Sequence, residues 1–463
     1  MNVKSLAYLR PFFLGRLYPI FVVALVFLSH VFGLELFSTV LILASLCVGL
    51  LVTGSILPLI SPLLLIFFEV SVGNSPSSPT FSGYLGSVGF LLPAFIMVAL
   101  VIASLVFVLW KRGALTRSSL RSLPFLIPSG VLVLSLLLNG VFSETYSVKN
   151  SLFGLLEGVA LTLVIYLFVL GFKGEDCERA VDNFVFISAL TVLLLFAETL
   201  ILFICGAAVR DGVVIKDFIF YGWGVSNTCG QVLASCIPLL MLGAMRSRKA
   251  AAFYIPVTML ALVTIVITLS RSALLIAGAL TLLSFVVGCF YGESKRIFRV
   301  VLPMLVLMGA FVLVAFREKI FLFVSDFLDK GFTDNGRFAL WQRGFDEFLE
   351  NPLFGKGFFS FEELTSDIIY LYIGFFPRML HNTVIELLAA TGIVGLVSYL
   401  AYRFFTVKIF VKRPSLAKTM LGLSVLALIG QSLLDNFIFY VQPVFTYSIA
   451  IALALWLGES KKV

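Results

Sequence analysis

Long apolar runs recur along almost the whole chain, and they constrain its fold more than any other feature of the sequence. A helix needs about 20 apolar residues to cross a bilayer, whereas a strand of an outer-membrane barrel alternates over about 10 residues. We assign fourteen crossings to the 463 residues, at 17–34, 36–53, 54–72, 86–110, 123–140, 151–172, 183–207, 226–245, 250–268, 270–291, 299–316, 382–402, 417–434 and 441–458. The sequence therefore predicts an all-α polytopic membrane protein with about fourteen transmembrane helices.

Composition supports this class of protein. Hydrophobic residues make up 60% of the chain and charged residues 13%, against about 45–50% and 25% in soluble domains. One apolar stretch, residues 36–72, is too long for a single crossing. We divide it near Gly54, because a helical hairpin satisfies its backbone hydrogen bonds within the bilayer.

The basic residues predict how the chain is oriented. Of the 33 Lys and Arg residues, 22 lie in loops on the side of the N-terminus, and 4 lie in the short loops of the other side. One of the basic loops is assigned Arg403, Lys408, Lys412, Arg413 and Lys418. Cytoplasmic loops carry such an excess, so we expect both termini in the cytoplasm. The net charge of +8 is then met by the membrane surface, and we expect no nucleic-acid partner.

One long polar segment divides the chain into three parts. Residues 1–316 form an N-terminal transmembrane bundle of about eleven crossings, residues 317–381 form an extracytoplasmic loop, and residues 382–463 hold about three crossings and a cytoplasmic tail. The loop contains two amphipathic pieces, IFLFVSDFLDK and GRFALWQRGFDEFLEN. We expect a helical lid that lies on the membrane surface.

The sequence predicts no metal centre and no cofactor. His30 and His381 are the only histidines, which excludes a histidine-rich metal site. The six cysteines are scattered through or beside apolar runs, without the paired spacing of a zinc site. We expect them to be buried structural thiols.

Arg271 is the first candidate functional residue. It lies in the SRS sequence of a very short turn between two apolar runs, so its guanidinium is held at or just above bilayer depth. Ser270 or Ser272 can cap the helix that follows, and a helix N-terminus beside a guanidinium favours anion binding. An arginine whose side chain extends to the lipid headgroups is the alternative.

A second group of candidates surrounds the re-entry into the membrane after the loop. Arg337 opens the loop helix, and Trp341 follows one turn later. His381 precedes Asn382 where the next crossing begins, and an imidazole near a helix N-terminus is biased toward its neutral form, as a general base requires. Glu386 lies one turn further on, and we expect it to face the cavity, because lipid would not tolerate its charge.

Weaker candidates lie in other loops. Arg378, three residues before His381, assists with phosphate or meets lipid headgroups. Arg210 and Tyr221 lie in a smaller outer loop and are candidates to line a groove for an acceptor sugar, although aromatic residues are common at membrane interfaces.

Two stretches of the chain, DNGRFALWQRGFDEFLENPLFGKGF and HNTVIELLAATGIVGLVSYL, resemble the signature region of the bacterial O-antigen ligase and polymerase family. Members commonly show GR, then LW, then NPLFGxG, then HN before a crossing that contains GIxGL. The SRS turn and GWGVSNTCG at 222–230 also resemble family segments. The resemblance is close over about residues 334–400 and looser over 222–275. The twelve crossings often given for the ligases are the alternative to fourteen.

The resemblance implies a C-type glycosyltransferase of the bacterial cytoplasmic membrane, with its active site on the outer face. Its donor would be an oligosaccharide linked through pyrophosphate to undecaprenyl. The arginine of the SRS turn is Arg271, that of the GR motif is Arg337, and the histidine of HN is His381, and all three lie on the outer side in the orientation given by the loop charges. The implied partners are the lipid-linked donor, a glycan acceptor and the bilayer, with a chain-length regulator and a flippase as further candidates.

Three activities stay open at this point. A polymerase that joins lipid-linked repeat units is our first choice, and a ligase that moves the glycan to another acceptor, such as lipid A core, is the close alternative. A transporter or flippase is the third. Transporters place charged sites near the midplane between repeated halves, whereas here the candidates gather at one surface and no internal repeat is visible.

Overall fold

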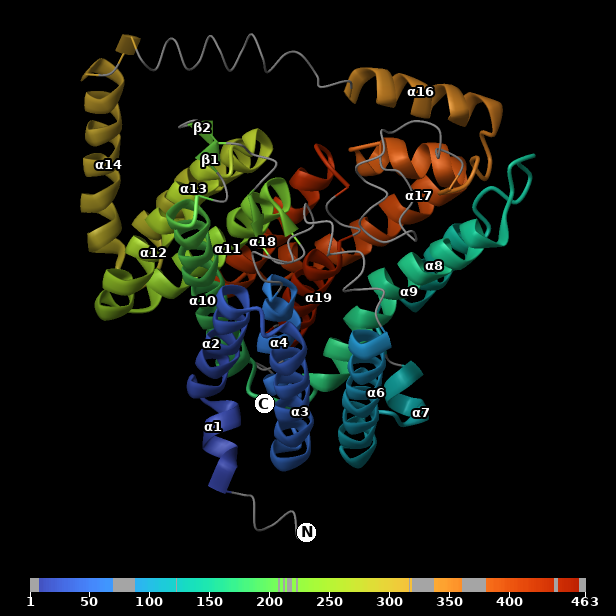
Figure 1. The fold of residues 1–463 in the computed structure, drawn as a ribbon, viewed down its shortest axis with the longest axis horizontal. Helices are drawn as coiled ribbons and strands as arrows, with labels where there is room; N and C mark the ends of the chain where they lie inside the picture. Colours follow the sequence, from blue (N-terminus) through green and yellow to red (C-terminus); the bar gives the residue numbers. More distant parts are fainter. Residues whose placement is uncertain are drawn as a thin grey trace.

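The structure is a computed structural model of the chain. It describes residues 8–69, 88–121, 123–206, 209–210, 213–214, 219–221, 224–315, 317–318, 337–359, 380–436 and 440–457. Within these residues the chain is mainly helical, and its helices pack side by side into a bundle (Figure 1). The predicted amphipathic piece at 320–330 lies outside the described residues.

Helix occupies each of the fourteen stretches that the sequence predicts to cross the membrane. In chain order these are α2 (Leu17–Phe32), α3 (Glu35–Thr53), the segment Leu57–Phe68, α6 (Val88–Lys111), α8 (Leu126–Leu137), α9 (Val148–Gly171), α10 (Cys177–Ile204), α11 (Ser226–Arg246), α12 (Arg248–Ile267), α13 (Arg271–Phe290), α14 (Lys295–Ala315), α17 (Thr383–Val411), α18 (Leu416–Ser432) and α19 (Val441–Trp456). Shorter or more polar helices are α1 (Arg10–Leu14), α7 (Arg117–Arg121) and α16 (Arg337–Glu350).

Eight of these helices, α3, α6, α9 to α13 and α17, are long and apolar enough to cross a membrane, and α2, the segment Leu57–Phe68, α8, α18 and α19 are shorter apolar helices. The chain is a multi-pass membrane protein, and the predicted polytopic α-helical class is confirmed.

The predicted division near Gly54 is also confirmed. Helix α3 ends at Thr53, and Gly54 follows with φ +65, its N–H donating to the carbonyl oxygen of Leu50 at 2.9 Å. Glycine adopts this left-handed conformation at no steric cost. The segment Leu57–Phe68 after it is broken into the 3-10 turn η2 (Leu57–Leu59), α4 (Ile60–Leu65) and the 3-10 turn η3 (Ile66–Phe68).

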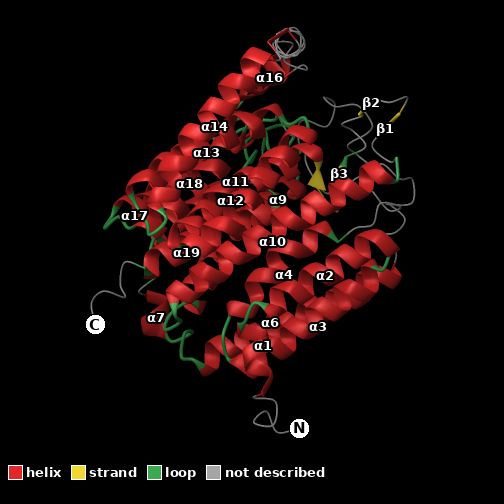
Figure 2. Ribbon diagram, turned by 90° about the vertical axis from the view of Figure 1, so that its left-hand side faces the viewer, coloured by secondary structure: helices red, strands yellow, loops and turns green. Residues whose placement is uncertain are grey.

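Helix α11 forms the centre of the bundle, where α10, α12, α13 and α18 pack around it (Figure 2). Its contact with α13 is close, since a Cβ added at Gly230 would lie 3.0 Å from the Cβ of Ala273. Its contact with α18 includes a hydrogen bond from the hydroxyl of Ser424 to the carbonyl oxygen of Ser235 at 2.7 Å. Helix α13, which begins at Arg271, is therefore held against the core.

Two short hairpins join α10 to α11, where the sequence predicted only a loop. Strand β1 (Val209–Arg210) pairs antiparallel with β2 (Val213–Val214), and β3 (Phe220–Tyr221) pairs with β4 (Gly224–Val225). These strands are rich in Val, Phe and Tyr, which favour extended backbone. Two-residue pairs add little stability of their own, and the all-helical class of the membrane part is unaffected.

One part of the predicted basic cytoplasmic loop, which was assigned Arg403, Lys408, Lys412, Arg413 and Lys418, is wrong. Helix α17 continues to Val411, so Arg403 and Lys408 lie within a helix. The guanidinium carbon of Arg403 lies 4.2 Å from the ring centre of Tyr447 and 4.8 Å from that of Tyr399. Cation–π contacts of this kind offset part of the cost of burying the charge, which is why the helix does not end before this arginine.

Candidate active site

Helix α16, the start of α17 and the loop between α18 and α19 meet at one end of the bundle. Helix α16 begins at Arg337 and lies along the first half of α17 (Figure 1). Trp341, one turn into α16, donates from its indole nitrogen to the carbonyl oxygen of Leu380 at 2.9 Å. This bond holds the start of α16 against the residue that precedes His381.

His381 makes a side-chain contact with an acidic residue that the sequence analysis did not select. Its Nδ1 lies 3.0 Å from Oδ1 of Asp435, in the loop between α18 and α19. Asp435 is buried, at 5% exposure, whereas the side chain of His381 is 34% exposed. The imidazole is therefore anchored on its Nδ1 side and remains partly exposed.

The environment of Asp435 favours its charged form. Burial alone would raise the pKa of this carboxyl, but the hydrogen bond and charge of His381, the N–H of Asn436 and the charge of Arg337 together hold the pKa below its ordinary value. An ionised carboxylate can only accept hydrogen bonds. The proton between the two side chains is therefore assigned to Nδ1 of His381, so that Nε2 is the nitrogen that accepts a proton when the ring acts as a base.

Three consecutive residues of the α18–α19 loop each accept a bond from a predicted site residue. The carbonyl oxygen of Leu433 accepts from the amide of Asn382 at 3.0 Å. That of Leu434 accepts from Nη1 of Arg337 at 2.8 Å. Asp435 accepts from His381, as described above. This loop therefore joins the start of α16 to the start of α17.

Asn382 also positions the first turn of α17. Its side-chain oxygen accepts from the backbone N–H groups of Val384 and Ile385 at 2.9 and 3.2 Å, as an N-cap does. His381, the residue before the cap, has a φ of +52, a conformation that a non-glycine residue rarely adopts. The cap and the contact of the imidazole with Asp435 hold the backbone of His381 in this unusual conformation.

Glu386 lies in the first turn of α17 and is buried by its neighbours. It is 2% exposed. Its Oε2 accepts from the backbone N–H of Leu380 at 2.6 Å and from the amide of Asn436 at 3.0 Å. We expected this carboxyl to face the cavity, and the structure instead places it as a link between the loops that flank His381 and Asp435.

Arg271 begins α13, and its side chain is exposed. The preceding Ser270 occupies the N-cap position, but its hydroxyl makes no capping bond, and this buried oxygen has no hydrogen-bond partner among the described residues. Five residues into α13, Ile276 lies 3.4 Å from the position of a Cβ added at Gly430 on α18. The first turns of α13, which begins at Arg271, therefore pack near the carboxyl end of α18, the helix that leads to Leu433, Leu434 and Asp435.

For the remaining predicted residues the structure describes no side chain. Arg210 lies in β1 and Tyr221 in β3, where the structure describes the backbone. Arg378 lies outside the described residues.

Asp435 and Asn436 are the site residues that the sequence analysis missed. They follow the predicted crossing at 417–434 directly, and the next crossing begins at 441. A polar pair in so short a connection between two apolar runs was the available signal. Nothing local, however, links this pair to a histidine 54 residues earlier.

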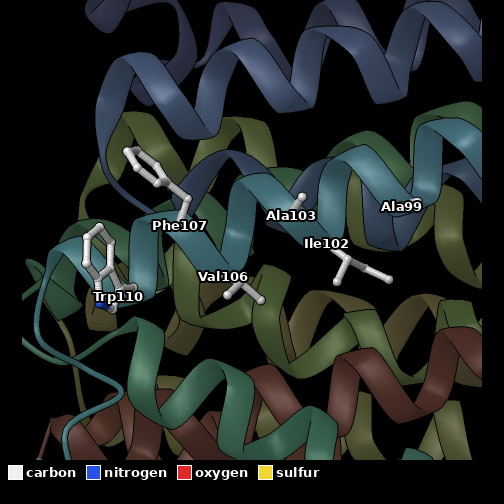
Figure 3. A pocket seen from close by; sticks show the side chains of 6 residues that line it. All are labelled: Ala99, Ile102, Ala103, Val106, Phe107 and Trp110. Carbon is white, nitrogen blue, oxygen red and sulfur yellow. The ribbon is translucent and has the colours of Figure 1, made fainter.

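Figure 3 shows a groove on α6 whose lining includes none of the predicted site residues. Its volume is about 590 Å³, and its lining consists of Ala99, Ile102, Ala103, Val106, Phe107 and Trp110. None of these side chains ionises, so the groove supplies no acid or base. Among the described residues, no group of three or more His, Cys, Asp or Glu side chains is placed to hold a metal ion.

The site therefore contains a partly exposed imidazole with an orienting carboxylate whose environment favours its charged form, and a guanidinium tethered to the same loop by one of its nitrogen atoms. An imidazole held in this way can accept a proton, and a guanidinium presents five donors that suit an anion such as phosphate. The arrangement fits the transfer of a group away from an anionic leaving group.

A family model described as O-antigen ligase matches residues 256–400. The matched region extends from α12 to the middle of α17 and includes Arg271, Arg337 and His381, and it ends before Asp435. A search of curated proteins found no match. Members of this family are enzymes of the ligase or glycosyltransferase type. This match supports the predicted assignment to the O-antigen ligase and polymerase family.

Proposed function

We propose that this protein is a glycosyltransferase that polymerises oligosaccharide repeat units carried on undecaprenyl pyrophosphate. The proposal rests chiefly on one observation: Arg337 and His381 are both bonded to the loop at 433–435. The guanidinium proposed to bind the leaving group and the imidazole proposed to act as the base are thereby held by the same three residues. The family match and the apolar surroundings support a lipid-linked substrate.

The base in the proposed reaction is Nε2 of His381. It accepts the proton from a hydroxyl of the acceptor sugar while the hydroxyl oxygen forms a bond with the anomeric carbon of the donor. The bond between that carbon and the pyrophosphate oxygen breaks, and undecaprenyl pyrophosphate leaves with the electron pair. Asp435 keeps the ring in the tautomer that has Nε2 unprotonated, and it stabilises the imidazolium that forms.

Arginine side chains take the place of a metal ion in this scheme. Nη1 of Arg337 donates to Leu434, and we propose that other N–H groups of this guanidinium bind the pyrophosphate, with Arg271 as the second cation. Donors fixed in advance around a developing charge stabilise the transition state without reorganisation. We propose Trp341, Arg378, Arg210 and Tyr221 as further substrate contacts, and Asn382 and Glu386 as residues that support the site.

The proposed orientation follows from the loop charges. With both termini in the cytoplasm, the start of α17 and the end of α18 face the outer side of a bacterial cytoplasmic membrane. The loop at 317–381 would then cover the site from outside, between the bundles at 1–316 and 382–463. Labelling of single cysteines near each terminus, in intact cells and after permeabilisation, tests this orientation: labelling of either terminus in intact cells contradicts it.

Transfer of the glycan to a different acceptor is the second candidate function, since the family match is to an O-antigen ligase. Polymerase and ligase share the donor chemistry and differ in the acceptor. Purified protein given only the lipid-linked repeat unit separates them. A ladder of longer products supports the polymerase, whereas product formation that requires a second acceptor, such as lipid A core, supports the ligase.

A further inference from the structure

Helix α17 is broken one third of the way along its length. Gly392 has φ 64 and ψ −166, which is not helical. In an unbroken helix the N–H groups of Ile393 and Val394 would donate to the carbonyl oxygens of Ala389 and Ala390. The break therefore leaves two donors and two acceptors to be paired in another way, and unpaired backbone groups are not tolerated inside a bilayer or a protein core.

A segment that follows α16, residues 351–359, fills this break, and we refer to it as the wedge. It supplies all four missing partners: Ile393 donates to Pro352 O at 2.9 Å, Val394 to Leu353 O at 3.2 Å, Lys356 to Ala389 O at 2.9 Å and Gly357 to Ala390 O at 2.9 Å. Two lost helical bonds are thus replaced by four bonds between residues that are 33 or 41 positions apart in the chain.

Glycine makes this insertion possible. A Cβ added at Gly392 would lie 2.4 Å from the carbonyl carbon of Leu353, and one added at Gly355 would lie 2.3 Å from that of Ala390. Both glycines also have positive φ values, +64 and +67. Only glycine permits backbones to approach so closely in these conformations.

The opposite side of the wedge is held by the α8–α9 hairpin, where two asparagines accept from its backbone. Oδ1 of Asn139 accepts from the N–H of Phe358 at 3.3 Å, and Oδ1 of Asn150 accepts from that of Phe359 at 2.8 Å. The amide of Asn139 donates to the carbonyl oxygen of Asn150 at 2.7 Å. Both asparagines are buried, at 0% and 1% exposure.

The wedge is tied to α16 as well. Nζ of Lys356 forms a short ion pair with Oε2 of Glu347, which is buried, and lies 3.4 Å from Oε2 of Glu350. The pKa of Lys356 is raised, because these two carboxylates outweigh its partial burial. The α8–α9 hairpin, the wedge, α16 and the first half of α17 therefore form one connected unit.

We propose that Asn150, supported by Asn139, is a positioning residue for the proposed glycosyl transfer. It acts through the wedge, which fixes α16 against α17 and so sets the position of Arg337 relative to His381. This inference depends on the proposed function, because it assigns Asn150 a part in the same reaction. Neither asparagine lies within the region that the family model matches.

The test compares two substitutions of Asn150 in the full-length protein. Asn150→Asp keeps the oxygen that accepts from Phe359, and it loses only an amide nitrogen that has no hydrogen-bond partner among the described residues. The negative charge lies in the first turn of α9, where the helix dipole favours it. Asn150→Ala removes the acceptor. Gly130→Ala on α8, where an added Cβ meets nothing within 4 Å, is the control.

Two measurements are made on each variant: kcat and KM with the lipid-linked donor, and hydrogen–deuterium exchange of the peptides that cover α16 and the wedge. We expect Asn150→Ala to lower kcat by roughly 10- to 100-fold, as small misplacements of reacting groups do, with a smaller change in KM. Exchange in α16 and the wedge should become faster, while exchange in α13 stays as in the wild type. Gly130→Ala should retain wild-type values, and Asn150→Asp should lie closer to wild type than Asn150→Ala, because it keeps the acceptor although it buries a charge.

Wild-type kcat in Asn150→Ala overturns the inference, as does a lower kcat with unchanged exchange in α16. If Asn150→Ala does not fold, Lys356→Met is used instead, because it cuts the link between the wedge and α16 at a half-buried position. The same pair of effects, smaller in size, is then required. Failure of the wild-type protein to transfer sugar from the donor would instead refute the proposed function, and the exchange comparison would still report whether Asn150 holds α16.

Discussion

Nδ1 of His381 lies 3.0 Å from Oδ1 of Asp435, across 54 residues of sequence and the whole length of two membrane helices. The contact gives the imidazole one fixed tautomer, because the carboxylate has no proton to donate. It also connects the start of α17 to the loop between α18 and α19. The neighbouring carbonyl oxygen of Leu434 binds Arg337, so the position of this loop determines the geometry of both proposed reacting groups.

Asp435→Asn should lower kcat by about 10- to 1,000-fold, less than the roughly 10²- to 10⁴-fold that the general base itself contributes. The amide can turn a donor toward Nδ1, and the ring then loses its preference for an unprotonated Nε2. Asp346→Asn on the exposed face of α16 is a matched control, since Asp346 contacts Gln342 and not His381. Steady-state rates with a defined lipid-linked donor provide the measurement, and an unchanged kcat in Asp435→Asn would refute the orienting role.

The stability that Asp435 provides should depend on pH in a defined direction. Its folded-state pKa is lowered, so its contribution is fully present above the unfolded-state pKa of about 3.9. That contribution is lost as the pH falls below this value and through the lower folded-state pKa. The difference in unfolding midpoint between wild type and Asp435→Asn should therefore shrink as the pH falls from about 5 to below 4. A difference that grows over this interval would contradict the assignment.

Arg337→Lys should raise the KM for the donor about tenfold, the effect of losing one hydrogen bond to a charged group. Lysine keeps the charge, but it cannot bind Leu434 and a phosphate with separate arms of a rigid fork. Arg343→Lys on the same helix is the control, because Arg343 is exposed and pairs loosely with Glu347 at 3.7 Å. Equal KM values for the two variants would remove Arg337 from the proposed phosphate site.

Arg271→Lys tests the second cation. If Arg271 binds the pyrophosphate through two donors at once, lysine should lower kcat/KM about tenfold or more, since a point charge does not reproduce bidentate geometry. Full activity in Arg271→Lys would show that charge alone suffices. Full activity in Arg271→Ala would show that the residue has no role in the reaction.

Trp341→Phe should cost stability more than chemistry. The indole nitrogen donates to Leu380, and loss of one such bond typically lowers the free energy of unfolding by about 1 kcal/mol. Thermal unfolding in detergent measures this. A variant that unfolds at the wild-type temperature would show that the start of α16 is held by other contacts.

The sequence was sufficient for the features that depend on local pattern. Runs of apolar residues located the membrane helices, and Gly54 marked the break between two of them, because a left-handed helix end favours glycine. The helix that begins at Arg337 also follows from local sequence.

Features that depend on long-range contact could not be predicted. Gly392 lies within the apolar run ATGIVGL, which has the composition of an unbroken helix, and only the presence of the wedge shows why the helix breaks there. Arg403 was assigned to a loop because a charge usually ends a crossing, whereas the rings of Tyr399 and Tyr447 hold it inside a helix. Asp435 was missed because its partner is distant in sequence.

The central claim is that His381 accepts a proton from the acceptor sugar in a reaction that needs no metal. The most direct measurement is the rate of product formation by purified protein in liposomes with a defined undecaprenyl-pyrophosphate-linked repeat unit, in the presence and absence of chelator. We predict that wild type is equally active in both conditions and that His381→Ala is slower by about 10²- to 10⁴-fold. Wild-type activity in His381→Ala, or loss of wild-type activity on addition of chelator, would contradict this account.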